Sequence, residues 1–316
     1  MKNASFSTII EDLKISFRFA YKNAISYLLA LFGVVIVSGL LIVVVAATIF
    51  IPMIFIIGID NLTTFFESFS GLENTGLSNL AVGSIMFALP FIAPFMVAIG
   101  ALFGMGREVV ESEGTSVGGV FTWYKKKFLS LAGGGLLLFL IVVGPLILLL
   151  ILGAALYGDQ FLTIAVISSG PANFANPIAI SLLLIWVAVS TGLLSMLFPS
   201  MIDGYSALES IKRSVKLSIR YFDRVFGIWM AFLVIFAILT VPMFLISFVF
   251  ALTGPALWVA AGLLTIYAIP AMIILVFFYL PAVTIGLTRT YMIVTADDEY
   301  VENLEDESGP SFIGGV

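Results

Sequence analysis

Residues that commonly carry out chemistry are scarce in the apolar parts of this sequence. The chain has no cysteine and no histidine, which excludes disulfides, thiolate or imidazole metal sites, haem ligation by these residues, and catalysis by a Cys nucleophile or a His base. No Asp, Glu, Lys or Arg lies in the middle of a long apolar run, where ionisable groups usually mark proton relays, ion sites or voltage sensors. We therefore expect no catalytic residue, no cofactor and no metal site, and a protein that is not an enzyme.

Hydroxyl side chains are the polar groups that could still line a path for a solute. Some transporters bind their solutes with hydroxyls and carbonyls at broken helices. The candidates for such a path are Ser190, Thr191 and Ser195, and further hydroxyls in the apolar runs are Thr48, Ser181 and Thr240. The alternative is that these hydroxyls bond to carbonyls of their own helix and serve helix packing.

Basic residues next to the apolar runs are the second set of candidates. Each Lys or Arg beside a membrane contributes about 1 kcal/mol of attraction to an anionic leaflet. We expect membrane lipids with anionic headgroups as partners, a protein at the same face as a further partner, and no nucleic acid. The alternative is that these cations only fix the topology. The candidate contact residues are Lys14, Arg18, Lys22, Lys212, Arg213, Lys216, Arg220 and Arg224.

The composition places these residues in a membrane protein. The chain is 61% hydrophobic and 10% charged, whereas soluble domains carry about 25% charged residues. A helix needs about 20 apolar residues to cross a bilayer. The fold class expected is an all-α membrane protein with about six transmembrane helices. The expected spans are residues 24–57, 78–105, 129–157, 177–199, 225–252 and 255–287.

The placement of positive charge predicts the orientation of the chain. All fourteen Lys and Arg residues fall on one side of the membrane if the chain has these six spans. Because cytoplasmic loops are enriched in Lys and Arg, both termini are expected in the cytoplasm of a multi-pass protein of the cell membrane. The glycosylation sequon at residues 61–63 would then lie on the outer side.

Similar segments recur before the spans and suggest an internal repeat. Residues 13–19 (LKISFRF) match residues 215–221 (VKLSIRY) class for class, and residues 117–128 form a weaker middle copy. The transmembrane domain, residues 1–290, is therefore expected to contain three helix-hairpin units, each preceded by a cytoplasmic amphipathic helix. Their approximate bounds are 5–105, 106–200 and 201–290. An acidic cytoplasmic tail, residues 291–316, is expected to be mobile, to bind a basic partner, or to fold against the basic helices.

Local patterns support the amphipathic helices. Ser206 with Glu209, and Thr8 with Glu11, have the spacing of a capping box. The helix after Ser206 is expected to turn an apolar stripe toward lipid or the bundle and basic residues toward water or headgroups. The stripe consists of Leu208, Ile211, Val215, Ile219 and Phe222.

The run PSMIDGYSALESIKRSVKLSIRYFDRVFG, residues 199–227, resembles a family of poorly characterised prokaryotic polytopic membrane proteins. That family is similar to the membrane domain of some glycerophosphodiester phosphodiesterases. Its pattern is matched here by Pro199, Asp203, Gly204, Ser214, Phe222, Arg224 and Gly227. The resemblance implies a membrane fold, and the family has no established activity to carry over to this chain.

Two functions remain open from the sequence. The leading hypothesis is a non-enzymatic membrane scaffold or accessory subunit, which rests on the missing catalytic residues and the repeated interfacial helices. The alternative is a transporter or channel for a small uncharged or lipid-like solute, which rests on the proline-containing spans and the threefold plan.

Overall fold

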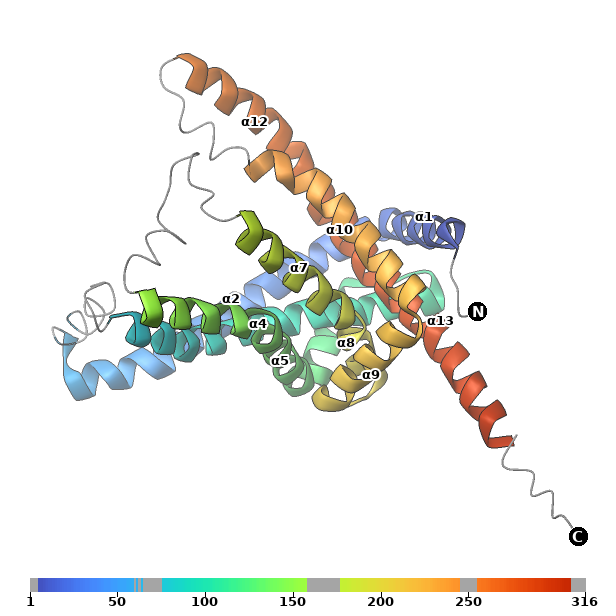
Figure 1. Ribbon diagram of the computed structural model, residues 1–316, viewed down its shortest axis with the longest axis horizontal. Coiled ribbons are helices and arrows are strands. Elements are labelled where there is room, and N and C mark those ends of the chain that lie inside the picture. The colour runs from blue at the N-terminus through green and yellow to red at the C-terminus, as the bar shows by residue number, and fades with distance from the viewer. Residues whose placement is uncertain are drawn as a thin grey trace, which may run out of the picture.

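The computed structural model describes residues 5–59, 61, 64, 76–157, 177–244 and 255–307, and these residues form helices and no strand (Figure 1). Ser5, Asn23 and Ser206 each lie at a helix boundary. The helices in chain order are α1 (Phe6–Lys22), α2 (Ala24–Ile57), α4 (Gly76–Ser112), α5 (Val117–Tyr157), α7 (Pro177–Leu193), α8 (Leu197–Asp203), α9 (Ala207–Arg220), α10 (Phe222–Phe244), α12 (Pro255–Ile274), the π-helical segment η2 (Leu275–Tyr279) and α13 (Leu280–Glu307).

Six helical segments of the described chain are long and apolar enough to cross a membrane, which confirms the expected all-α, multi-pass architecture. The expected outer loops and the sequon at residues 61–63 lie mostly outside the described residues. The six segments are Ala24–Ile56, Pro90–Ser112, Val117–Leu149, Ser181–Asp203, Phe222–Pro242 and Gly262–Tyr300.

The separate helix expected before the third span is wrong. Residues 117–128 are the first turns of α5, which continues without interruption to Tyr157. By contrast, α1 ends at Asn23, whose side-chain amide donates to the Phe19 carbonyl oxygen at 3.0 Å. No such cap ends the helix within residues 117–128. The basic residues of this segment therefore lie in the first turns of the same helix that forms the third span.

The expected capping box at Thr8 and Glu11 is also wrong. The helix begins earlier, because the Ser5 hydroxyl oxygen accepts from the Thr8 backbone N–H at 3.4 Å. The capping box at Ser206 and Glu209 is confirmed, with both reciprocal hydrogen bonds present. These bonds hold the pKa of Glu209 below its usual range.

The two breaks in the described spans lie near other prolines than Pro52 and Pro270: Pro199 is in the first turn of α8, and Pro281 follows η2. Pro52 lies inside α2 and Pro270 inside α12, and both helices continue past them. One break is the turn at residues 194–196, between α7 and α8. The other is η2, where the backbone widens to π-helical geometry before α13 begins.

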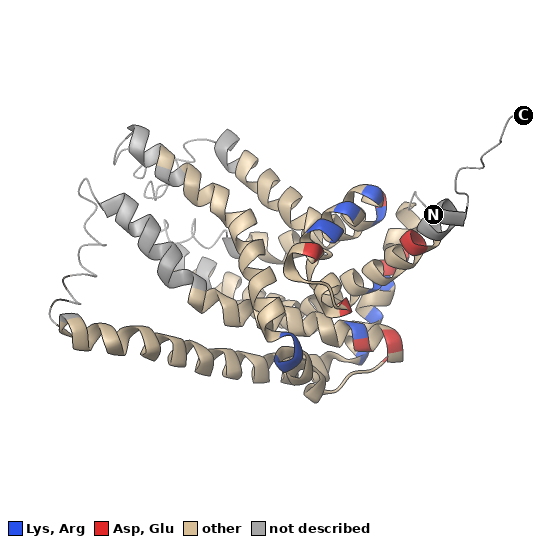
Figure 2. Cartoon of the chain, turned by 90° about the horizontal axis from the view of Figure 1, so that it is seen from below, with Lys and Arg blue, Asp and Glu red and all other residues tan. Residues whose placement is uncertain are grey.

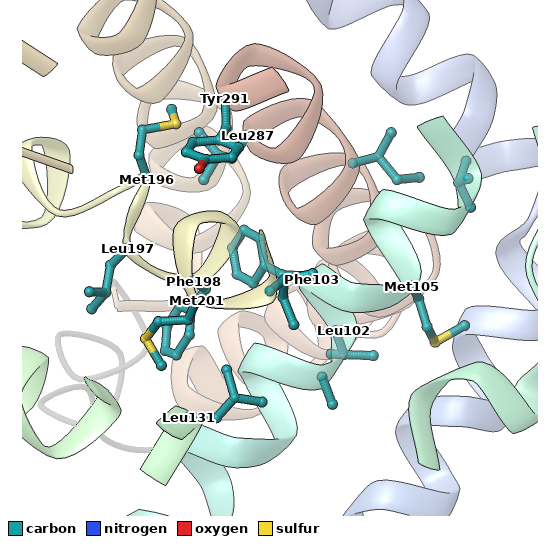
Figure 3. Close-up of a cluster of buried hydrophobic side chains, with 14 of the residues drawn as sticks. Leu102, Phe103, Met105, Leu131, Met196, Leu197, Phe198, Met201, Leu287 and Tyr291 are labelled. Carbon is teal, nitrogen blue, oxygen red and sulfur yellow. The ribbon is translucent and has the colours of Figure 1, made fainter. Parts of the chain in front are cut away.

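The long helices diverge from a common base (Figure 1). Helices α2, α4 and α5 run together, while α10 and α12 lead away from them on the other side. The buried core lies at the base, where α4, α5, α8 and α13 meet (Figure 3). Phe103 stacks on Phe198 there, with ring centroids 5.5 Å apart. The described core therefore holds one end of the molecule together.

Charged residues cluster along the chain at that same end, which we call the charged end (Figure 2). Helix α13 crosses it and continues to Glu307. The acidic segment expected as a tail from residue 291 thus begins inside α13. For residues 291–300 the structure shows the third of the alternatives, folding against the basic helices, because Tyr291, Val294 and Asp298 are buried and Asp298 pairs with cations of α9. Residues 308–316 lie outside the described residues.

Candidate functional site at the charged end of the bundle

A buried carboxylate on α1 joins three helices that are distant in the sequence. Asp12 is 3% exposed and accepts from Arg224 of α10, with Nη2 at 2.9 Å and Nε at 3.2 Å. Arg289 of α13 forms a second ion pair with the same carboxylate. The buried carboxylate has a counter-charge on each oxygen, as buried charges require. The cluster fixes α1 to the ends of two spans.

A second acidic residue joins α4, α8 and α13. The Asp203 carboxylate accepts from Arg107 Nη1 at 2.8 Å and from the Tyr291 hydroxyl at 2.9 Å. Arg107 also donates through Nε to Glu111, one turn further along α4, at 2.7 Å. Gly204 follows Asp203 at φ +124°, a conformation that favours glycine, and it ends α8 there.

The acidic part of α13 contacts the basic side of α9. Arg220 Nη1 lies 2.5 Å from one Asp298 oxygen, and Lys216 Nζ lies 3.3 Å from the other. Arg213 Nη2 lies 3.8 Å from Glu299 Oε1. Burial, followed by the negative charge of Asp298, raises the pKa of the Tyr221 hydroxyl. We call this set of ion pairs the α9–α13 contact.

Serine side chains of α9 hold the break between α7 and α8. Ser214 Oγ donates to the Leu193 carbonyl oxygen at 2.8 Å and accepts from the Met196 backbone N–H at 3.1 Å. Ser218 Oγ donates to the same carbonyl at 3.1 Å. These bonds satisfy backbone groups that the broken helix leaves without a partner.

The expected apolar stripe of α9 is divided between the surface and the bundle. Leu208 and Ile219 are exposed, and so is Phe222, which is the first residue of α10. Ile211 is partly buried and packs against the core, and Val215 is partly buried. The most deeply buried side of α9 carries Ser214, Leu217 and Ser218. Small hydroxyl side chains allow α9 to approach the α7–α8 break closely, which explains why serine occupies the buried side.

The structure separates the expected contact cations into two groups. Lys14, Arg18 and Lys212 have no carboxylate within ion-pair distance among the described residues. The other five are paired with carboxylates of the chain itself: Lys22 with Glu113, Arg213 with Glu299, Lys216 and Arg220 with Asp298, and Arg224 with Asp12.

The outward side of α1 combines cations with large apolar side chains. Phe6 is 77% exposed and Tyr21 is 75% exposed, and Ile10 lies on the same side of the helix. Lys14 and Arg18 are exposed between them. We call these five residues the outer face of α1. Its mixture of aromatic, aliphatic and basic side chains is typical of a helix that lies in the headgroup region of a membrane.

Most of the hydroxyls considered for a solute path bond to their own helices. Ser190 and Thr191 donate to the Val187 carbonyl oxygen, at 3.3 and 2.5 Å. Thr48 and Thr240 also donate to carbonyls one turn earlier, and Ser181 is exposed. Ser195 is buried and its hydroxyl has no hydrogen-bond partner within the part of the chain that the structure describes. Ser195 thus lies in the α7–α8 break, whose backbone groups at Leu193 and Met196 bond to serines of α9.

Sequence reasoning missed three features of this end. Asp12 and Asp298 were not among the candidates, although each is the acid on which two cations converge. Asp12 carries a local signal, since it lies four residues before Ser16 and eight before Ala20 on one buried line of α1. The third feature is the basic run of α5, whose cations have no carboxylate partner among the described residues: Lys125, Lys126 and Lys127.

The residues that carry the family resemblance occupy structural positions at this end. Asp203, Ser214 and Arg224 form the contacts above, and Gly227 lets Ile9 of α1 approach α10 closely. No family model matches the chain, and no curated protein and no solved structure matches it either. What the chain does must therefore be inferred from its own residues.

Proposed function

We propose that this protein is a non-enzymatic scaffold or accessory subunit of the cell membrane, with its charged end and both termini in the cytoplasm. Helices α1 and α9 would be the amphipathic helices of the first and third units, and α5 with α7 would be the middle unit. The similar sequences of α1 and α9 and their similar positions before α2 and α10 support this plan.

The outer face of α1 is the observation that carries the proposal. Phe6, Ile10 and Tyr21 would enter the boundary between headgroups and acyl chains, while Lys14 and Arg18 would contact anionic headgroups. The opposite side of α1 is fixed to the bundle through Asp12. The helix is therefore held with its mixed face outward, as an interfacial helix must be.

The other unpaired cations of the described chain lie at the same charged end. Lys125 and Lys126 are exposed on α5, and Lys212 is exposed on α9. Their positions at the start of a span and beside an apolar stripe support a common leaflet for all three helices. Anionic lipids are thus the partner that this end fits by charge, and a protein that binds the same face is the second partner of the proposal.

A charge-removal experiment tests the proposal. The full-length protein is purified in mild detergent from its native membrane, and bound proteins and lipids are identified by mass spectrometry. The variant Lys14→Gln with Arg18→Gln should lose anionic lipid. Lys22→Gln is the matched control, because Lys22 is the next cation on α1 but is already paired with Glu113.

Two results would contradict the proposal. One is unchanged retention of anionic lipid in the double variant, which would remove the role of the outer face of α1. The other is a lone protein that catalyses flux of a small solute in reconstituted vesicles, which would make the chain a transporter. A stoichiometric protein that co-purifies with the wild type would support the scaffold or subunit role.

A further inference from the structure

The α9–α13 contact pairs cations of α9 with carboxylates. The equivalent cations of α1 are exposed. Lys14 of α1 corresponds to Lys216 of α9, and Arg18 corresponds to Arg220. The α1 pair has no carboxylate partner among the described residues, whereas the α9 pair contacts Asp298. The two equivalent cation positions are therefore without a carboxylate partner in α1 and paired with a carboxylate in α9, within the described residues.

The covering group comes from the chain itself. Asp298 and Glu299 lie on α13, 78 or more residues after the cations that they meet. Asp298 is 5% exposed, so it is enclosed by the contact, while Glu299 lies at its edge. A carboxylate pair placed on a basic helix mimics the charge of a phospholipid headgroup.

We propose that the basic side of α9 is a second surface for anionic phospholipid headgroups, which Asp298 and Glu299 cover in this structure. The inference rests on the proposed placement of the charged end at a leaflet. Lipid phosphates and the two carboxylates compete for Arg213, Lys216 and Arg220. An anionic leaflet therefore favours separation of the acidic segment of α13 from α9.

Two observations support competition. Two of the ion pairs have one exposed member: the Lys216 side chain is 52% exposed beside the buried Asp298, and that of Glu299 is 66% exposed beside Arg213. Water and salt reach these pairs from one side and screen them. The neighbouring stripe of Leu208, Ile219 and Phe222 is exposed beside the cations, which gives α9 the same mixture of side chains as the outer face of α1.

Lipid titration is the first test. The full-length protein in detergent is titrated with phosphatidylglycerol, with phosphatidylcholine as the neutral lipid, and bound lipid is counted by native mass spectrometry. Glu299→Gln should raise the apparent affinity for phosphatidylglycerol by about fivefold for one freed cation. Asp298→Asn with Glu299→Gln should raise it further. Asp223→Asn, which changes an exposed acid of α10 at the same end that forms no ion pair with a described residue, should leave it unchanged.

A distance measurement is the second test, and it does not depend on the stability of the variants. Because the chain has no cysteine, spin labels can be placed at Leu208→Cys on α9 and Tyr300→Cys on α13, which are both exposed and outside the capping box. The label distance should lengthen when neutral nanodiscs are replaced by discs that contain phosphatidylglycerol. Lys216→Gln with Arg220→Gln should abolish that response.

The outcomes separate this inference from the proposed function. Equal affinity for phosphatidylglycerol in wild type and Glu299→Gln, together with an unchanged label distance, overturns the second surface. A loss of lipid in the α1 double variant in the same experiment would leave the proposed function standing. No loss in that variant, combined with a gain in Glu299→Gln, would overturn the role of α1 and retain that of α9.

Discussion

Arg224 and Asp12 lie 212 residues apart in the chain and form an ion pair of 2.9 Å, with the carboxylate almost completely buried. Arg289 contacts the same carboxylate. The three residues come from α1, α10 and α13, so this cluster joins the first helix to the fifth and sixth spans. A surface ion pair contributes little, but removal of one member of a buried group leaves the others without a counter-charge.

We expect Asp12→Asn to destabilise the protein strongly. The change leaves Arg224 and Arg289 beside a neutral group in a largely buried position, which costs about 3 kcal/mol. Glu11→Gln, the neighbouring exposed acid, is the control and should have little effect. Thermal unfolding in detergent measures both. Equal stability of the two variants would show that the Asp12 cluster does not hold α1.

Two buried serines of α9, one with hydrogen bonds and one without a partner in the described chain, allow a direct comparison of the same substitution. Ser214→Ala removes two hydrogen bonds from the α7–α8 break and leaves the Met196 backbone N–H without its partner, while the Leu193 carbonyl keeps Ser218, at a cost of about 1–3 kcal/mol. Ser210→Ala changes an equally buried serine whose hydroxyl has no partner among the described residues. It should be neutral or slightly stabilising. A similar loss in both variants would contradict the role given to Ser214.

Glycines in α4 and α5 predict opposite effects of the same substitution. A Cβ at Gly106 would lie 2.9 Å from the backbone oxygen of Thr284, so Gly106→Ala should force α4 and α13 apart at a cost of about 1–3 kcal/mol. A Cβ at Gly133 meets nothing within 4 Å. Gly133→Ala should stabilise the helix by about 0.5–1 kcal/mol. Unfolding midpoints that move in the same direction for both variants would contradict this packing.

The capping box predicts a pH dependence for α9. The pKa of Glu209 is lowered by its hydrogen bonds to Ser206, so the folded state favours the charged carboxylate. That stabilisation is fully present above the unfolded pKa of about 4.3 and is lost as the pH falls through the lowered pKa. The difference in unfolding temperature between wild type and Glu209→Gln should therefore shrink on acidification. A difference that grows at low pH would contradict the capping role.

Much of the architecture could be predicted because it depends on local properties. Each span can be recognised from its own apolar run. Because successive loops lie on alternate sides of the membrane, the side on which each Lys or Arg is expected follows from the loop that contains it. The capping box at Ser206 depends on residues only three apart. The prediction of a separate helix before the third span was wrong, because no residue after Phe128 ends the helix there. The similarity of residues 117–128 to the other copies carries no information about where a helix ends.

The pairing of charges could not be predicted from the same information. Arg213, Lys216 and Arg220 read as cations free for lipid, because their partners Asp298 and Glu299 come from the other end of the chain. Which face of α9 is buried also depends on the break between α7 and α8, and the sequence of α9 alone does not indicate which side packs against that break. Only the three-dimensional contacts assign the buried side to serine.

The position of Asp12 has a consequence for synthesis. The ribosome delivers this carboxylate with the first helix, while its partners Arg224 and Arg289 emerge only with the last third of the chain. Helix α1 therefore cannot reach its final place until the sixth span has been inserted. A chain that ends before Arg289 leaves the carboxylate of Asp12 with Arg224 as its one counter-charge among the contacts seen here.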